Sequence, residues 1–241
     1  MVGVILAAGD GTRLAKSTGQ DICKSLRKIN DKHLIEYALN NLIALGTTDA
    51  YVVIGKQGDL IKEAIGEKYE SLNVHYVRQA QQNGLVNAFV EALNVIDDSE
   101  TVILQLADEI FVDLKTEAIK NALISDNSNF YCGVTYEENE EKIKNNFSVK
   151  ADENNILIKC VEKPKTVTDN IKGTGFSIFN GEAQRIIKET YAQNPEKLYD
   201  LCDCFNYLTE LDCRGSILFI AEREFNINTV LDLTEAEVFF K

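Results

Sequence analysis

The sequence of 241 residues predicts a single-domain α/β protein, built as a three-layer sandwich around a predominantly parallel mixed sheet. Two observations support this fold class. Short apolar runs rich in β-branched residues alternate with segments that have the apolar spacing of amphipathic helices. No Gly/Ser-rich or Pro-rich linker separates the two halves of the chain. Such alternation typically places parallel strands in one sheet and packs the connecting helices on its faces.

The first half is expected to supply the parallel strands. Strands are expected at residues 2–7, 50–54, 74–77 and 101–106, and helices at 34–45, 60–69 and 85–96. The clearest helix is 34–45, where apolar residues stand at 34, 35, 38, 39, 42, 43 and 45. This spacing follows the helical period of about 3.6 residues and predicts one apolar face toward the sheet.

The second half is expected to extend the sheet and to cover its open end. Strands are expected at residues 130–135, 156–161, 175–179 and 216–221, and helices at 181–191, 198–211 and 231–239. The polar stretch 137–146 is interpreted as a solvated loop or a loose helix.

The charge is distributed unevenly along the chain. There are 25 Lys and Arg residues against 38 Asp and Glu residues, a net charge of −13. This balance excludes the basic surface that nucleic acid binding requires. Residues 1–28, in contrast, hold five basic and two acidic residues, a local net charge of +3. A basic region in an acidic protein predicts a small anionic ligand.

A membrane-spanning segment, disulfide bonds and a histidine-based metal site are not expected. The longest early apolar run, residues 4–8, is far shorter than the roughly 20 residues that span a bilayer. The N-terminus has no signal-peptide pattern, so we expect a cytoplasmic protein. His33 and His75 are not spaced as metal ligands. Reduced thiols are expected for the six scattered cysteines, Cys23, Cys132, Cys160, Cys202, Cys204 and Cys213.

The strongest local signal is the loop L-A-A-G-D-G-T-R-L at residues 6–14, followed by Lys24. Its two glycines permit a tight bend that exposes backbone N–H groups to an anion. Arg13 adds a side chain suited to bidentate phosphate binding. A Walker A loop is absent, and Leu14 stands where a dinucleotide-binding fingerprint has its third glycine. These features favour a nucleotide phosphate site over a dinucleotide-dependent oxidoreductase.

The loop resembles the signature of nucleotidyltransferases that activate sugar phosphates, L-A-A-G-x-G-T-R-L followed by a lysine. The resemblance implies a Rossmann-like fold of the nucleotide-diphospho-sugar transferase type, in which this loop binds the triphosphate of an NTP. Lys16 and Cys23 stand where many members have proline. The resemblance assigns nucleotide binding here to Leu6, Ala8, Gly9, Gly11, Thr12, Arg13 and Lys24.

A second segment, Q-A-Q-Q-N-G-L-V-N-A-F at residues 79–89, resembles Q-x-x-x-x-G-L-x-x-A-[FI] of glucose-1-phosphate thymidylyltransferases. That branch is the closest in motif. The resemblance implies that Gln79 and Gly84 contact the pyrimidine. By itself the segment is also explained as a polar loop that begins a helix.

Magnesium ligands are expected at two positions. Asp108 follows an apolar strand, and ligands of open α/β sheets bind at the carboxyl ends of strands. Its carboxylate is a hard oxygen ligand of the kind that Mg²⁺ prefers. The resemblance implies that Asn228 is a second ligand, at a position where other branches have Asp or Asn. A turn aspartate and a helix-capping asparagine are the alternative interpretations. Glu109 is a weaker candidate.

The acceptor site is predicted from the triplet E-K-P at residues 162–164. In the family this triplet precedes a T-G strand that lines the acceptor pocket. The resemblance therefore assigns acceptor contacts to Glu162 and Lys163, and less firmly to Gly175. Residues 145–149 depart from the family pattern, so the acceptor is the least defined part of the site.

These residues together predict a Mg²⁺-dependent nucleotidyl transfer from an NTP, with dTTP or UTP favoured, to a sugar 1-phosphate. Arg13, Lys24 and Lys163 are the expected catalytic cations. Residues 1–112 would bind the NTP and residues 113–241 the small phosphorylated acceptor. A CTP-dependent cytidylyltransferase acting on an amino alcohol phosphate such as phosphocholine is the main alternative, and a non-catalytic nucleotide-sensing module is another. The base, the acceptor and a homo-oligomeric state stay open.

Overall fold

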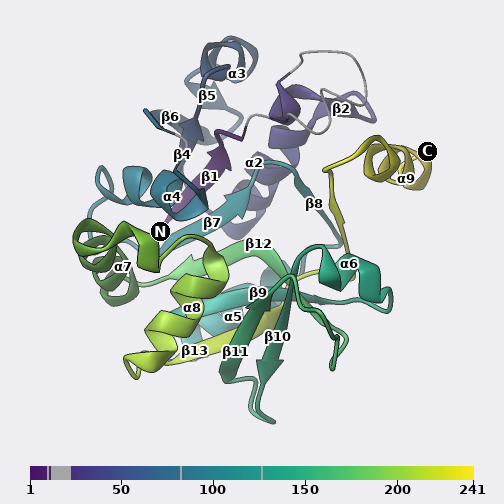
Figure 1. Ribbon diagram of the computed structural model, residues 1–241. Coiled ribbons are helices and arrows are strands. Elements are labelled where there is room, and N and C mark those ends of the chain that lie inside the picture. Colours follow the sequence, from purple (N-terminus) through teal and green to yellow (C-terminus); the bar gives the residue numbers. More distant parts are fainter. Residues whose placement is uncertain (10, 12–22, 82, 126) are drawn as a thin grey trace.

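The computed structural model describes residues 1–9, 11, 23–81, 83–125 and 127–241 (Figure 1). The elements of the first half are β1 (Val2–Ala7), η1 (Lys24–Leu26), β2 (Lys28–Ile29), β3 (Lys32–His33), α2 (Leu34–Leu45), β4 (Asp49–Ile54), α3 (Gly58–Ile65), β5 (Lys68–Tyr69), β6 (Leu72–Arg78), α4 (Leu85–Leu93), β7 (Val102–Leu106) and β8 (Glu109–Val112). Those of the second half are α5 (Thr116–Ser125), β9 (Phe130–Tyr136), α6 (Glu140–Lys144), β10 (Phe147–Ala151), β11 (Leu157–Glu162), β12 (Ile171–Phe179), α7 (Gly181–Gln193), η2 (Pro195–Lys197), α8 (Leu201–Glu210), β13 (Gly215–Phe219), β14 (Arg223–Asn226) and α9 (Val230–Phe239).

A mixed sheet contains strands from both halves of the chain. Along its main path the order is β11-β10-β12-β7-β1-β4-β6-β5, and β9 pairs with both β12 and β13. β1 lies parallel between β4 and β7, and β6 is parallel to β4. β12 is antiparallel to β7 and thereby joins the second half to this parallel part. The expected α/β fold with a mixed sheet is confirmed.

Helices cover both faces of the sheet, as a three-layer sandwich requires (Figure 1). Side chains alternate along β1, so that Val4 belongs to one apolar core and Ile5 to the other. The first core packs against α4, α7 and α8, and the second against α2, α3 and α5. Both cores are made mostly of fully buried aliphatic and aromatic side chains.

Several elements differ from the sequence expectation. The helix expected at 60–69 ends at Ile65, because Gly66 adopts a left-handed φ of 77° and the chain then turns into β5. Within the stretch expected to be a loop or loose helix, residues 140–144 form α6. Several short or partly polar elements, among them β8, β10, β14 and α5, were not expected. Their local sequence carries little periodicity, and β8 and β14 depend on pairing with each other.

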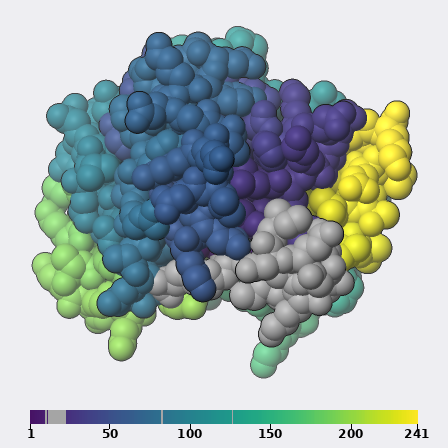
Figure 2. Space-filling view, turned by 90° about the horizontal axis from the view of Figure 1, so that it is seen from above, coloured from purple at the N-terminus to yellow at the C-terminus, as the bar shows by residue number. Residues whose placement is uncertain are grey.

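The β8–β14 pair brings the C-terminal region to the end of β7. In this antiparallel pair Asn226 lies opposite Glu109, and the N–H of Ile227 donates to the carbonyl of Asp108 at 2.9 Å. A third apolar cluster, which includes Ile29, Leu34 and Ala236, packs α9 against the start of α2. C-terminal residues accordingly lie beside N-terminal residues on the surface (Figure 2).

The cysteines and histidines have structural environments. All six cysteines are free and buried. His33 caps α2 together with Glu36, and the ring of His75 lies 2.8 Å from the carboxylate of Asp49. Among the helices that the structure describes, none combines the length and the apolar character needed to cross a membrane.

Candidate active site

A cavity of about 630 Å³ opens at the carboxyl ends of β1 and β7. The two strand ends are held together there, because the N–H of Ala107 donates to the carbonyl of Leu6 at 3.1 Å. The cavity collects many of the residues predicted to bind nucleotide or metal. Those that line it are Leu6, Ala8, Gly9, Lys24, Gln79, Gly84 and Asp108.

Lys24, Asp108 and Asn228 meet at one point of the site. The Lys24 ammonium contacts the carboxylate of Asp108 and donates a hydrogen bond of 2.9 Å to Oδ1 of Asn228. Lys24 lies in η1, Asp108 in the turn after β7, and Asn228 between β14 and α9. The Lys24 side chain is only 12% exposed, so this ion pair is partly shielded from solvent.

The phosphate loop is described only in part. Gly11 has a φ of +58°, and a Cβ built on it would lie 2.9 Å from the Cβ of Lys24. The loop backbone therefore passes close to Lys24 at a position that suits glycine. Thr12 and Arg13, which are predicted to bind the triphosphate, lie outside the described residues.

The end of the cavity formed by β6 and α4 holds Gln79 and Gly84. Nε2 of Gln79 donates to Oδ1 of Asn87 at 2.8 Å and to the carbonyl of Gly84 at 3.3 Å. Because Nε2 is engaged, Oε1 is the end of this buried amide left for a ligand N–H. Gly84 has a φ of +99°, and a Cβ there would lie 3.2 Å from the Tyr199 ring. Tyr199, which sequence reasoning missed, also lines the cavity.

The predicted acceptor lysine lines a second cavity, of about 240 Å³, which also reaches Asn228. The backbone N–H of Lys163 donates to the carbonyl of Asn146 at 2.7 Å, and its Nζ lies 3.0 Å from Oε1 of Glu162. Burial raises the pKa of the Glu162 carboxyl, while the Lys163 ammonium opposes that shift. The Lys163 side chain is 67% exposed, and it lines this cavity.

Gly175 has a different environment from the other predicted acceptor residues. It is buried in β12, and its N–H donates to Oε2 of Glu109 at 2.7 Å. It does not line either of these two cavities. In the structure Gly175 therefore contacts Glu109, the residue that follows Asp108 in the chain, and not the predicted acceptor residues.

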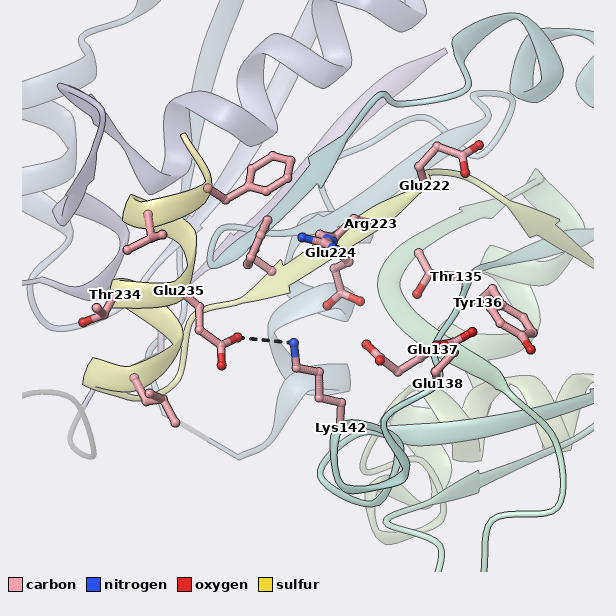
Figure 3. Close-up of a pocket in the computed structure, with 14 residues that line it drawn as sticks. Thr135, Tyr136, Glu137, Glu138, Lys142, Glu222, Arg223, Glu224, Thr234 and Glu235 are labelled. Atoms are coloured by element: carbon pink, nitrogen blue, oxygen red, sulfur yellow. Dashed lines mark hydrogen bonds and ion pairs between the residues drawn. The ribbon is translucent and has the colours of Figure 1, made fainter. Parts of the chain in front are cut away.

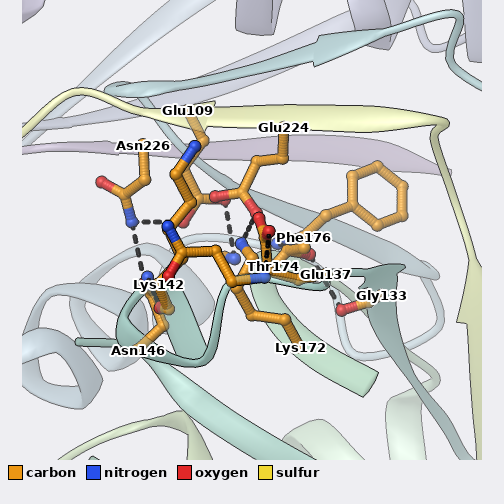
Figure 4. Close-up of polar contacts among 12 residues, drawn as sticks. Glu109, Gly133, Glu137, Lys142, Asn146, Lys172, Thr174, Phe176, Glu224 and Asn226 are labelled. Carbon is orange, nitrogen blue, oxygen red and sulfur yellow. Dashed lines mark hydrogen bonds and ion pairs between the residues drawn. The ribbon is translucent and has the colours of Figure 1, made fainter. Parts of the chain in front are cut away.

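A buried polar cluster that sequence reasoning missed contributes Lys172 and Glu224 to the lining of the second cavity; Figure 4 shows these side chains. The ammonium of Lys172 pairs with the carboxylate of Glu224, and both side chains are nearly inaccessible to solvent. Burial raises the pKa of nearby Glu109 well above its usual value, and the carboxylates of Glu224 and Asp108 add to the shift. One feature of the sequence could have indicated this cluster. Lys172 stands inside a largely apolar strand segment, immediately before G-T-G, and a buried lysine needs a charged partner.

A third cavity, of about 670 Å³, is drawn in Figure 3 and shares lining residues with the second one. The ion pair between Lys142 of α6 and Glu235 of α9, at 3.3 Å, borders both cavities. The third cavity combines carboxylates with aromatic rings. Its acidic side chains are Glu137, Glu138, Glu222, Glu224 and Glu235, and its aromatic ones are Tyr136, Phe225 and Phe239.

The donor atoms around Lys24 fit a magnesium ion that is completed by substrate. A carboxylate and an amide oxygen converge there on one positive charge. Mg²⁺ is commonly held by one or two carboxylates together with substrate phosphates and water. Within the described ranges there is no group of three or more His, Cys, Asp or Glu residues arranged to hold a metal, so an all-protein metal cage is not seen there.

Comparison with known proteins relates both the sequence and the fold to one family. The profile described as Nucleotidyl transferase matches residues 2–218. The UTP–glucose-1-phosphate uridylyltransferase AglF of Haloferax volcanii is 28% identical over 179 residues, which are 74% of this chain and 72% of that protein.

Two solved structures share the fold over nearly the whole chain. One, assigned as a glucose-1-phosphate thymidylyltransferase of Bacillus anthracis, superposes with a TM-score of 0.85 at 20% identity and covers 99% of this chain and 95% of that one. The other, the inositol-1-phosphate CTP transferase of T. maritima, has a TM-score of 0.79 at 20% identity and covers 100% and 95%.

Proposed function

Because the chain belongs to the nucleotidyl transferase family, we propose that it joins an NTP to a sugar 1-phosphate, releasing pyrophosphate and forming an NDP-sugar. The similarity to a UTP–glucose-1-phosphate uridylyltransferase supports this reaction class. The observation that carries the proposal is the meeting of Lys24, Asp108 and Asn228 at the mouth of a cavity that also holds Gln79. The NTP is dTTP or UTP, as the motif around Gln79 suggests.

The reaction is an in-line displacement at the α-phosphorus. An oxygen of the acceptor phosphate forms a bond to this phosphorus as the bond to the bridging oxygen breaks, and that electron pair leaves with pyrophosphate. A phosphate monoester dianion is already a nucleophile, so no side chain has to remove a proton. The protein acts by positioning the two phosphates and by neutralising their charge.

Separate tasks in this reaction are proposed for the residues that would contact phosphate or metal. The backbone at Gly9 and Gly11, together with Arg13, binds the β- and γ-phosphates. Lys24 lies beside the α-phosphate, and Lys163 orients the acceptor phosphate. Asp108 and Asn228 hold Mg²⁺, which when bound supplies charge neutralisation at the transferred phosphoryl group.

A screen of pyrophosphate release tests this proposal directly. The purified protein is incubated with Mg²⁺, one of dTTP, UTP, CTP, ATP or GTP, and either glucose 1-phosphate or phosphocholine. We expect the highest rate with dTTP or UTP and glucose 1-phosphate, and loss of that rate in D108A. Tight NTP binding without pyrophosphate release on either acceptor would instead favour a nucleotide-sensing module.

A second acceptor class is favoured by the third cavity. Its five glutamates outnumber its two cations, Lys142 and Arg223, and aromatic rings lie among them. Carboxylates and aromatic faces bind organic cations, so an amino alcohol phosphate could place its phosphate near Lys163 and its cationic group beyond the Lys142–Glu235 pair. The similarity in fold to a CTP transferase is compatible with CTP as its donor.

The same screen distinguishes the two acceptors. A rate with CTP and phosphocholine that exceeds the rate with glucose 1-phosphate would favour the amino alcohol phosphate. In that case E138Q, which changes a carboxylate of the third cavity, should raise the KM for phosphocholine. E153Q, on an exposed turn outside the three cavities, is the matched control and should leave it unchanged.

A further inference from the structure

Asn226, at the end of β14, lines the second cavity together with Asn228 of the candidate metal site. Its Nδ2 donates to Oε1 of Glu109 at 3.2 Å and to Oδ1 of Asn146 at 3.0 Å (Figure 4). Its Oδ1 accepts from Nδ2 of Asn228 at 2.5 Å. Both ends of this amide are therefore engaged by side chains of the site.

The partners of Asn226 determine which way its amide faces. Two oxygen acceptors lie on one side, so the NH₂ group must face them and the carbonyl oxygen must face Asn228. Asn228 then presents its own NH₂ group to Asn226. Its Oδ1 consequently faces the Lys24 ammonium, at 2.9 Å.

This orientation matters because only the oxygen of an amide can ligate Mg²⁺. If the Asn228 amide rotated by half a turn, its NH₂ group would face the position proposed for Mg²⁺. Asn228 could then no longer act as a metal ligand. Hydrogen-bonding groups behind a metal ligand generally fix its orientation in this way.

We propose that Asn226 is a positioning residue that orients the Asn228 amide toward the metal and ties this ligand to the acceptor side through Asn146. The inference rests on the proposed function, because it deepens the role of the same site. Asn146 connects Asn226 to the predicted acceptor residue Lys163, because the backbone carbonyl of Asn146 accepts a hydrogen bond from the backbone N–H of Lys163 at 2.7 Å. One amide thus couples the position of the metal ligand to that of the lysine expected to bind the acceptor phosphate.

Binding of Mn²⁺ in the presence of inorganic pyrophosphate, followed by electron paramagnetic resonance, tests this role without turnover. We expect N226A to raise the apparent Kd for Mn²⁺ by about 10- to 100-fold, the usual effect of removing a group that orients a ligand. N226S, which retains a small polar side chain, should give a smaller increase. Thermal denaturation of both variants verifies that they fold.

A double-mutant cycle separates positioning from a general loss of structure. If Asn226 acts through Asn228, then N226A/N228A should bind Mn²⁺ no more weakly than N228A alone. In kinetics, added Mg²⁺ should restore much of the kcat of N226A. Additive effects, or wild-type Mn²⁺ binding by N226A, would overturn the role of Asn226.

N206A is the matched control, because the side-chain amide of Asn206 is also hydrogen-bonded through both its oxygen and its nitrogen. Oδ1 and Nδ2 of Asn206 bond the backbone N–H and carbonyl of Cys160, each at 2.9 Å, away from the cavities. This variant should lose stability and keep its affinity for Mn²⁺. If the wild-type protein binds no Mn²⁺ in the presence of pyrophosphate, both the proposed metal site and this inference are wrong. If N206A and N226A lose equal affinity for Mn²⁺, only the inference is wrong.

Discussion

The ammonium group of Lys24 contacts the carboxylate of Asp108, although 84 residues separate the two in sequence. The same ammonium donates to Asn228, which is a further 120 residues along the chain. This one contact joins the segment after β1, the turn after β7 and the loop before α9. It places a fixed positive charge beside the oxygen atoms proposed to hold the metal, at the carboxyl ends of the central parallel strands.

Removal of the Asp108 carboxylate should abolish most of the activity. We expect D108A to lower kcat by at least about 100-fold, because the carboxylate proposed to hold Mg²⁺ at the transferred phosphoryl group is lost. The protein should stay folded, since the side chain is partly exposed at the mouth of the cavity. Pyrophosphate release and thermal denaturation measure the two effects.

The matched control changes an ion pair far from the site. E189A removes the Arg185–Glu189 pair on α7, where both side chains are more than half exposed. Such a pair contributes little, so activity and stability should both remain close to wild type. Equal activity of D108A and E189A would contradict the assignment of Asp108.

Loss of the Gln79 amide should weaken nucleotide binding and leave the chemical step almost unchanged. Its Oε1 is available to a base N–H, and a hydrogen bond of this kind contributes about 0.5–1.5 kcal/mol. We therefore expect Q79A to raise the KM for the NTP by up to about 10-fold with a similar kcat. Steady-state kinetics with Q193A on the exposed end of α7 as control verify this. A fall in kcat at unchanged KM would contradict a binding role and would indicate that Gln79 acts in the chemical step.

The pH dependence of acceptor use should report on Glu162. Burial, together with the nearby carboxylates of Asp200 and Asp203, raises the pKa of this carboxyl above its usual value of about 4.3. As the pH falls, Glu162 therefore gains its proton earlier than a free glutamate would, and it loses its charge. We expect kcat/KM for the acceptor to fall on an acidic limb above pH 4.3.

The E162Q variant tests the assignment of that limb. Glutamine cannot titrate, so the limb should disappear while the plateau at higher pH is reduced. E141Q, on the exposed face of α6, should retain the wild-type profile. Persistence of the same limb in E162Q would assign it to another group.

The stability of the second half should depend on the buried ring of Phe205. It stacks on Phe130 with a centroid distance of 5.6 Å and on Phe179 at 6.1 Å, and all three side chains are fully buried. We expect F205A to lower the free energy of unfolding by about 3–5 kcal/mol, because it leaves a cavity in the core. Urea denaturation measures this. F219A, whose ring is 37% exposed, should cost clearly less, and equal losses would contradict this account.

Local sequence patterns predicted the elements that are complete within one segment. The bounds of β1 and α2 agree with the expected 2–7 and 34–45, because apolar periodicity and the flanking turns are contained in the segment itself. The start of α4 at Leu85 was expected for the same reason. β8 and β14 could not be predicted in this way, because each is stabilised by the other across more than 100 residues.

The α/β class, the glycine-rich loop after the first strand and the residue types suited to phosphate and magnesium can all be recognised in the amino-acid sequence. The fold is needed to show that Lys24 faces both Asp108 and Asn228 and that Gly175 donates to Glu109. It is also needed to bring together Lys172, Glu224, Asn146 and Asn226. Such contacts depend on strand register and on packing between distant segments. A local pattern specifies which face of an element is apolar, but it does not specify which distant polar side chain will lie opposite.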